Sequence, residues 1–245
     1  MRIKDKINMT YDEFIQYGPI TIVAFGDSVT YGAMADGVVN YDAVYWNRLR
    51  KKLLQKRYGI PVNVINAGIG GVTATSSLAR LDSQVLVYKP DLTIVCFGLN
   101  DIHDPIETYC ASLETIFNQC QQVCQEVIFM TPNMLNTYVA EDTEERLIDC
   151  AQRTSVVQNS GKMDEYMNEA CKIAKKCGVT VCDCYSRWKE LSKTQDTTML
   201  LANRINHPCE EMHELFAQML YDKLFEENDH IDDSQIETMY QNISE

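Results

Sequence analysis

The sequence predicts an α/β fold in which helices cover both faces of a parallel β-sheet. Five short apolar runs, rich in β-branched residues, alternate along the 245 residues with longer segments whose apolar side chains recur at helical spacing. Strands that alternate with helices in this way form parallel sheets. The length suits a single domain, 1–245, with its core at about 20–226 and an acidic C-terminal extension at 227–245.

The elements can be placed in chain order. A short helix is expected in the lead-in at 1–19, because Thr10 is followed three residues later by Glu13, the pattern of a capping box. The strands are expected at 20–26, 62–66, 92–97, 127–131 and 179–183. The core helices are expected at 41–58, 75–88, 106–124, 162–177 and 209–226.

Two segments depart from this alternation. Residues 133–161 are polar, with acids clustered at 141–145, and predict a partly helical excursion at the sheet edge. That excursion is either a lid or substrate wall, or only an elaborate connection. Residues 227–245 carry several acids and no Lys or Arg, so this tail is either a docked helix or disordered.

Composition argues against several classes of protein. The net charge of −13 and the pI near 4.7 disfavour binding to nucleic acids or to anionic membrane surfaces. The first residues do not include the apolar stretch of a signal peptide. Ten cysteines without metal-binding spacing are typical of free thiols in a reducing compartment. A cytoplasmic location is therefore expected, with no metal.

The most informative point in the chain is the end of the first predicted strand. Ser28 follows Gly26 and Asp27 directly after the apolar run 20–25, and a helical pattern comes next. Open α/β sheets bind ligands at the carboxyl edge of their strands. Free N–H groups at a helix N-terminus can also hold a developing oxyanion. The alternative is that Ser28 is only a turn residue or a helix cap.

Three further motifs follow in order: a glycine-rich stretch at 66–71, Gly-Leu-Asn-Asp at 98–101, and His-Pro at 207–208. Together with Gly-Asp-Ser at 26–28, they resemble the motifs of the SGNH, or GDSL-type, serine hydrolases. The resemblance covers about 20–220. It implies a three-layer α/β/α fold with the flavodoxin-like strand order 2-1-3-4-5, which brings the ends of strands one, two and three side by side.

The resemblance also implies individual roles. Ser28 would be the nucleophile, and His207 would take its proton, because a serine hydroxyl is too weak an acid to react unaided. The N–H groups of Ser28 and Gly68 and the side-chain amide of Asn100 would form an oxyanion hole. The glycines at 70–71 compete with Gly68 for this role.

The other candidate residues have different interpretations. His103 lies just past the third motif and could line a pocket, whereas His213 falls on the last core helix and His230 in the acidic tail. Asp27 and Asp101 form a tempting carboxylate pair for acid–base chemistry. We interpret them instead as short acceptors that tie turn N–H groups at strand ends.

The chain departs from the family pattern at one position. The family usually carries an acid three residues before the histidine, and here Arg204 stands in that place. His207 is then oriented by a main-chain carbonyl or by Asn203, or a distant carboxylate such as Asp183 helps. The departure lowers the expected rate more than it changes the expected chemistry.

The expected activity follows from the resemblance. We expect a cofactor-independent carboxylic-ester hydrolase that cleaves a small acyl ester through a covalent acyl-enzyme, with acetyl removal from a carbohydrate or similar metabolite favoured. A thioesterase or a lysophospholipid acylhydrolase is the enzymatic alternative. The missing acid motivates a non-enzymatic alternative, a ligand-binding module with decayed catalysis. The expected partner is a small-molecule ester, and the oligomeric state stays open.

Overall fold

Five parallel strands form the centre of the structure. The computed structural model describes residues 1–35 and 37–225, so the predicted tail at 227–245 lies outside the described residues. The strands are β1 Ile20–Gly26, β2 Val62–Gly68, β3 Leu92–Cys96, β4 Glu126–Met130 and β5 Thr180–Cys182. They pair in the order β2-β1-β3-β4-β5, with every pair parallel. This is the predicted fold class and strand order.

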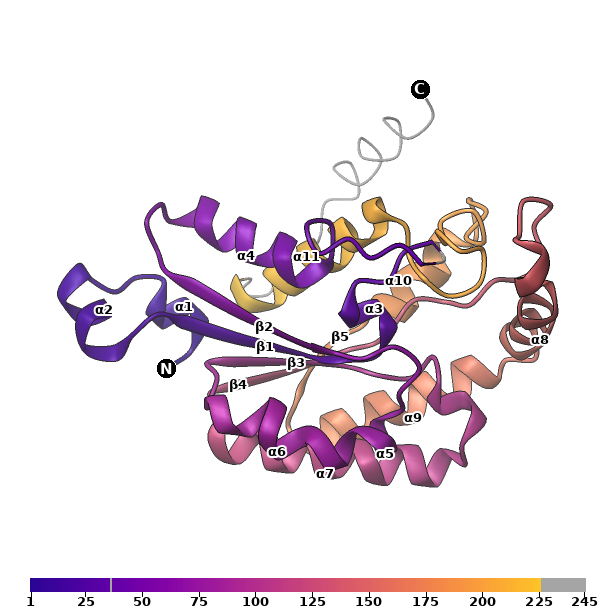
Figure 1. Ribbon diagram of the computed structural model, residues 1–245. Coiled ribbons are helices and arrows are strands. Elements are labelled where there is room, and N and C mark those ends of the chain that lie inside the picture. Colours follow the sequence, from indigo (N-terminus) through magenta and orange to yellow (C-terminus); the bar gives the residue numbers. More distant parts are fainter. Residues whose placement is uncertain (36, 226–245) are drawn as a thin grey trace.

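Helices cover both faces of the sheet and give three layers (Figure 1). The helices with their bounds are α1 Ile3–Lys6, α2 Tyr11–Tyr17, α3 Ser28–Tyr31, α4 Tyr45–Lys56, α5 Ala74–Ser77, α6 Leu81–Gln84, α7 Ile106–Val123, α8 Ile148–Asn159, α9 Lys162–Lys176, α10 Cys184–Leu191 and α11 Glu210–Phe225. One layer contains α4 and α11, and the other contains α5, α6, α7 and α9 (Figure 1).

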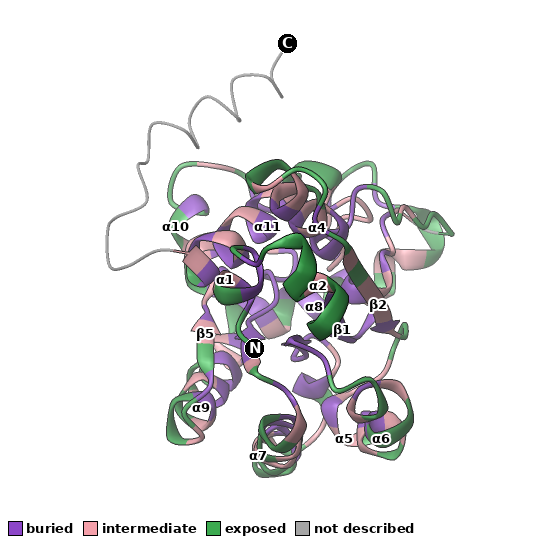
Figure 2. Ribbon diagram, turned by 90° about the vertical axis from the view of Figure 1, so that its left-hand side faces the viewer, coloured by how far each residue is buried: buried purple, intermediate pink, exposed green. Residues whose placement is uncertain are grey.

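The core lies between these layers. Every residue of β3 is buried, and in β1 only Thr21 is partly accessible. In Figure 2 the buried residues gather on β1 and on the helix sides that face the sheet, whereas β2 at the edge is mostly half-buried. The continuous burial of β1 and β3 explains their uninterrupted apolar sequences, because both faces of a central parallel strand are covered.

Most elements form where the sequence predicts them, with a few differences. The predicted helix at 75–88 is divided into α5, α6 and two short 3-10 turns at 78–80 and 86–88. The strand predicted at 62–66 extends to Gly68. An unpredicted helix, α10, begins at Cys184, with the Asp183 carboxylate accepting the Ser186 N–H as its N-cap. The capping box predicted at Thr10 is present at the start of α2.

The strand register brings three chain segments to one level at the carboxyl edge. Gly26 is the parallel partner of both Gly68 and Cys96, so β1, β2 and β3 end together. The short helix α3 packs closely on these ends. A Cβ atom at position 68 would lie 2.2 Å from the main-chain nitrogen of Tyr31, so no side chain fits there. Glycine at position 68 is therefore required by the close approach of α3.

Candidate active site

Ser28 and His207 meet at this carboxyl edge. The Ser28 Oγ lies 3.0 Å from Nε2 of His207, although 179 positions separate the two residues in the chain. Ser28 opens α3 directly after β1, and it is almost completely buried. His207 lies in the loop that precedes α11. The two residues predicted as nucleophile and base are thus brought into hydrogen-bonding contact.

The second ring nitrogen of His207 fixes the form of the imidazole. Its Nδ1 lies 2.9 Å from the main-chain carbonyl oxygen of Met34. A carbonyl oxygen only accepts hydrogen bonds, so Nδ1 carries the proton. In the neutral ring, Nε2 is then free to accept the proton of the Ser28 hydroxyl. This is the tautomer that a general base needs.

The environment of His207 favours its neutral form. Burial lowers the pKa of the imidazole below its ordinary value of 6.5, and the hydrogen bond to the Met34 carbonyl opposes this shift. A carboxylate partner would raise this pKa by stabilising the imidazolium. Among the described residues, none forms an ion pair with His207.

The Met34 carbonyl is held by the segment that follows the nucleophile. Met34 is buried, its N–H donates to the Val38 carbonyl, and Ala33 pairs with Val39 in a small antiparallel bridge. The N–H of Ala33 donates to the Ser28 carbonyl at 3.0 Å. Because one folded segment carries both the nucleophile and the support for the histidine, their relative position is set locally.

Asn203, predicted as a possible support for His207, contacts the main chain of the histidine loop and not the imidazole. Its Oδ1 accepts the N–H groups of Ile205, Asn206 and His207 at 3.0–3.1 Å. Its Nδ2 donates to the side-chain oxygen of Asn206. Asn203 therefore shapes the turn that presents the histidine. Asp183 caps α10, and within the described residues it forms no hydrogen bond or ion pair with His207.

Arg204, in the place of the family's acid, points away from the imidazole. Its guanidinium binds both carboxylate oxygens of Asp142 at 2.8–3.0 Å and also donates to the carbonyls of Met199 and Leu201. The main chain at Arg204 is left-handed, with φ of 58°. The residue therefore joins the histidine loop to the excursion that contains Asp142.

The excursion at 133–161 is fixed along the histidine loop by several contacts of this kind. Asn133 donates to the Asn206 carbonyl, and the Asn136 N–H donates to the Ile205 carbonyl. Its helical part is α8, at the right of Figure 1. These bonds make the excursion a support for the loop that carries His207, a role that its sequence did not indicate.

Gly68 does not offer a free N–H for an oxyanion in this structure. Its N–H donates to the side-chain oxygen of Asn66 at 2.9 Å. The next turn, at Gly70 and Gly71, lies closer to the nucleophile, since a Cβ atom at position 70 would be 3.9 Å from the Cβ of Ser28. Within the described residues, the N–H groups of Gly70 and Gly71 have no hydrogen-bond partner. The competing assignment to 70–71 is therefore better placed than Gly68.

Asn100 lies beside the same turn. One N–H of its side-chain amide donates to the Val72 carbonyl at 3.0 Å, which leaves the second N–H for a ligand. Within the part of the chain that is described, the Ser28 N–H also has no hydrogen-bond partner. Ser28, Asn100 and the turn at 70–71 thus bring unused donors to the ends of β1, β2 and β3.

Asp27 and Asp101 act as local acceptors, as their interpretation from sequence proposed. Asp27 accepts the Val29 N–H at the start of α3, and Asp101 accepts the Ala74 N–H at the start of α5. In the described residues each has one buried carboxylate oxygen without a partner. Burial raises the pKa of Asp27 to about 7 and that of Asp101 to about 6.

The remaining histidines lie elsewhere. His103 is exposed in a short 3-10 turn, and His213 is buried on α11, where its Nδ1 accepts the Tyr45 N–H. His230 lies outside the described residues. No group of His, Cys, Asp and Glu side chains in the described residues has the arrangement of a metal site.

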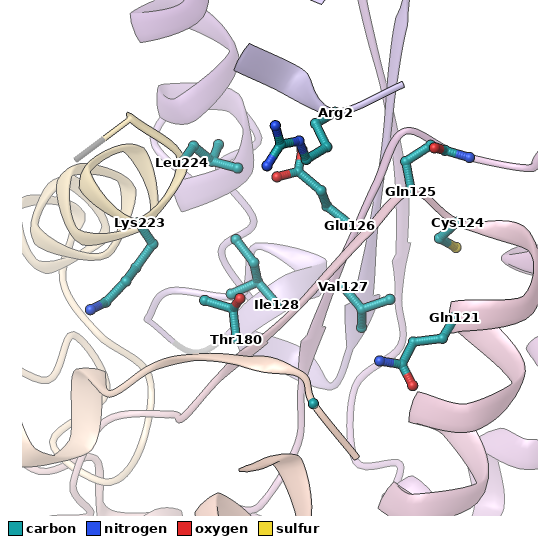
Figure 3. A pocket seen from close by; sticks show the side chains of 11 residues that line it. Arg2, Gln121, Cys124, Gln125, Glu126, Val127, Ile128, Thr180, Lys223 and Leu224 are labelled. Carbon is teal, nitrogen blue, oxygen red and sulfur yellow. The ribbon is translucent and has the colours of Figure 1, made fainter. Parts of the chain in front are cut away.

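A separate pocket of about 410 Å³ lies at the opposite, amino edge of the sheet (Figure 3). It is lined by the first residues of β4 and by Thr180 of β5, with Arg2 and Lys223 at its sides. Ser28 and His207 are not among its lining residues. This pocket is therefore distinct from the candidate active site.

A hydroxyl paired with a neutral imidazole at the edge of a parallel sheet is an arrangement that can support acyl transfer. Comparison with known proteins agrees with this class. The chain belongs to the GDSL-like lipase/acylhydrolase family, whose model matches residues 24–215. It is accordingly a carboxylic-ester hydrolase.

One curated relative is an esterase, and two solved structures share the fold. An acetylxylan esterase from Geobacillus stearothermophilus is 25% identical over 222 residues, which cover 80% of this chain and 90% of the relative. The solved structure of the acetylxylan esterase Axe2 from that organism gives a TM-score of 0.64 at 24% identity, covering 84% of this chain and 95% of that one. A lipase/acylhydrolase from Enterococcus faecalis also gives 0.64, at 24% identity, with 83% and 94% covered.

Proposed function

We propose that this chain is a serine hydrolase that removes a small acyl group, acetyl above all, from a carbohydrate or similar metabolite. The observation that carries the proposal is the 3.0 Å contact between Ser28 Oγ and His207 Nε2, with Nδ1 bound to the Met34 carbonyl. The preference for acetyl esters rests on the likeness to the acetylxylan esterase. We also propose a cytoplasmic location, because all ten cysteines are free thiols. None of the described helices is long and apolar enough to span a membrane.

The first half of the reaction forms the acyl-enzyme. His207 Nε2 takes the hydroxyl proton of Ser28 while Oγ attacks the carbonyl carbon of the ester. The carbonyl oxygen then carries the negative charge of the tetrahedral intermediate. The Ser28 N–H, the free N–H of Asn100 and an N–H of the turn at 70–71 are the donors that we assign to it.

His207, now an imidazolium, gives its proton to the leaving alcohol oxygen as the carbon–oxygen bond breaks, which completes the acyl-enzyme. In the second half, a water molecule attacks the acyl carbon with Nε2 as its base. The bond from that carbon to Ser28 Oγ then breaks, the acid is released, and His207 returns the proton to Ser28. The imidazolium is stabilised by a neutral carbonyl dipole and not by a carboxylate, which makes it less stable than in a Ser-His-Asp triad. We therefore propose a Ser-His dyad with a modest rate.

The test is covalent labelling combined with turnover. A fluorophosphonate probe is expected to label wild-type protein at Ser28 and to leave Ser28→Ala unlabelled. The p-nitrophenyl esters of acetate, butyrate and octanoate then rank the acyl lengths, with acetate expected to give the highest kcat/KM.

Ser28→Ala and His207→Ala are each expected to lose nearly all turnover, because nucleophile and base act as a unit. Circular dichroism serves as the control for folding of both variants. Residual activity of Ser28→Ala within about tenfold of wild type would remove Ser28 as the nucleophile.

A further inference from the structure

A partly buried arginine joins the carboxyl ends of the two strands that lead into the candidate active site. Arg80 donates through Nη2 to the Gly26 carbonyl at 3.0 Å and through Nη1 to the Ala67 carbonyl at 2.6 Å. Its guanidinium carbon also lies 4.5 Å from the ring centre of Phe25. The fork of a guanidinium matches two neighbouring acceptors with fixed spacing, so Arg80 holds the two strand ends at a set separation.

These two carbonyls are placed where such a link affects the reacting groups. Gly26 lies two residues before Ser28, and Ala67 lies three residues before Gly70. The N–H of Ile69 also donates to the Gly26 carbonyl, at 3.2 Å. The link therefore controls how the turn at 70–71 lies relative to the nucleophile.

Arg80 also carries a charge without an anionic partner. Its other hydrogen bonds are to neutral groups, Gln84 Oε1 at 2.9 Å and Ser77 Oγ at 3.1 Å. In the described part of the chain no carboxylate forms an ion pair with it. Burial lowers its pKa to about 10, so it stays protonated at neutral pH. A positive charge thus remains behind the strand ends where the oxyanion would form.

We propose that Arg80 is a positioning residue for ester hydrolysis: it locks the ends of β1 and β2 together and stabilises the oxyanion with its unpaired charge. The inference rests on the proposed function. Arg80 does not need to contact the substrate, because it acts through the main chain at Gly26 and Ala67 and through the electric field of its charge.

The experiment compares Arg80→Met, Arg80→Gln and Arg80→Lys with a matched control, Arg57→Met. Arg57 is also a half-buried arginine, donating to the Ile7 carbonyl at 2.6 Å near the ring of Phe14, away from the catalytic edge. Arg80→Met is expected to lower kcat for p-nitrophenyl acetate by about thirtyfold or more with KM within about threefold. Arg57→Met should leave kcat within about threefold of wild type.

The other two variants separate charge from hydrogen bonding. Arg80→Lys keeps the charge and loses the fork, whereas Arg80→Gln keeps a donor and loses the charge. We expect Arg80→Lys to retain about tenfold more kcat than Arg80→Gln. Equal losses in these two variants would overturn the role of the charge, and a small effect of Arg80→Met on kcat would overturn the proposal as a whole.

Hydrogen exchange provides a measurement that does not depend on turnover. The amides at 66–72 should exchange faster in Arg80→Met and should be unchanged in Arg57→Met. Unchanged exchange in Arg80→Met would overturn the positioning role whether or not the protein hydrolyses esters. The wild-type protein could fail to hydrolyse esters and fail to label at Ser28 while Arg80→Met still shows faster exchange at 66–72. That outcome would refute the proposed function alone.

Discussion

Replacement of Asn203 tests how His207 is held. In Asn203→Ala the N–H groups of Ile205, Asn206 and His207 lose their shared acceptor. Each hydrogen bond contributes roughly 0.5–1.5 kcal/mol, and solvent replaces part of this. If solvent compensates for about one of the three bonds, the net loss is that of two bonds, about 1–3 kcal/mol. This corresponds to a shift of about 5- to 150-fold in the equilibrium between the loop conformation that presents His207 and other loop conformations. We expect kcat/KM of Asn203→Ala to decrease by a factor within this range.

Asn203→Asp distinguishes loop shaping from direct support of the imidazole. The aspartate keeps an acceptor oxygen for the three N–H groups, so kcat/KM is expected to stay within about threefold of wild type. The assay is kcat/KM on p-nitrophenyl acetate for both variants, with Asn159→Ala as control, since Asn159 donates to the Thr137 carbonyl on the exposed side of α8. Circular dichroism confirms that each variant folds.

Two results would refute this reasoning. A change of less than about twofold in Asn203→Ala would mean that the three hydrogen bonds do not hold the loop in its active form. A rise of tenfold or more in Asn203→Asp would mean that a carboxylate at this position reaches the imidazole and outperforms the Met34 carbonyl.

Three further predictions follow from charges in the site. The acid limb of kcat/KM should have its midpoint below pH 6.5, because burial lowers the His207 pKa and only the neutral ring acts as base; a midpoint near 7 in a pH–rate profile would contradict the carbonyl-supported dyad. Arg204→Asp should lower kcat/KM and thermal stability, because the new carboxylate would face Asp142; a tenfold gain would show that it reaches His207 instead. Asp101→Asn should gain stability relative to wild type as pH rises from about 3.8 to about 6, because the folded state binds the Asp101 proton more tightly than the unfolded state does; urea unfolding at pH 4.5 and 7.5 measures the difference, and a constant difference would contradict it.

The fold was predictable because its signals are local and repeated. Apolar runs, glycine and proline stops and a capping box at Thr10 each depend on neighbouring residues, and the strands and main helices form close to the predicted bounds. The division of the predicted helix at 75–88 was not visible in this way. The helical backbone of that segment is interrupted at Val85, where φ is −129°. Arg80, shortly before it in the chain, binds the ends of β1 and β2.

Some contacts of the candidate site could not be predicted from the sequence, and the reasons are physical. Ser28 and His207 stand out because each belongs to a motif after a predicted strand. The Met34 carbonyl has no residue signature, since every residue has a main-chain oxygen. The hydrogen bond between Asn66 and the Gly68 N–H is local and could have been considered, because asparagine often accepts the N–H two residues later.

The support of His207 by Met34 has an evolutionary consequence. An acidic residue in a triad can be lost through one nucleotide change, whereas the Met34 carbonyl survives any substitution that preserves the folding of the segment around Ala33 and Val39. The contact with His207 then depends on the backbone shape at position 34 and not on the identity of its side chain. A search that requires an acid near the histidine would wrongly class chains of this kind as inactive, and the geometry of the segment after the nucleophile is the better criterion.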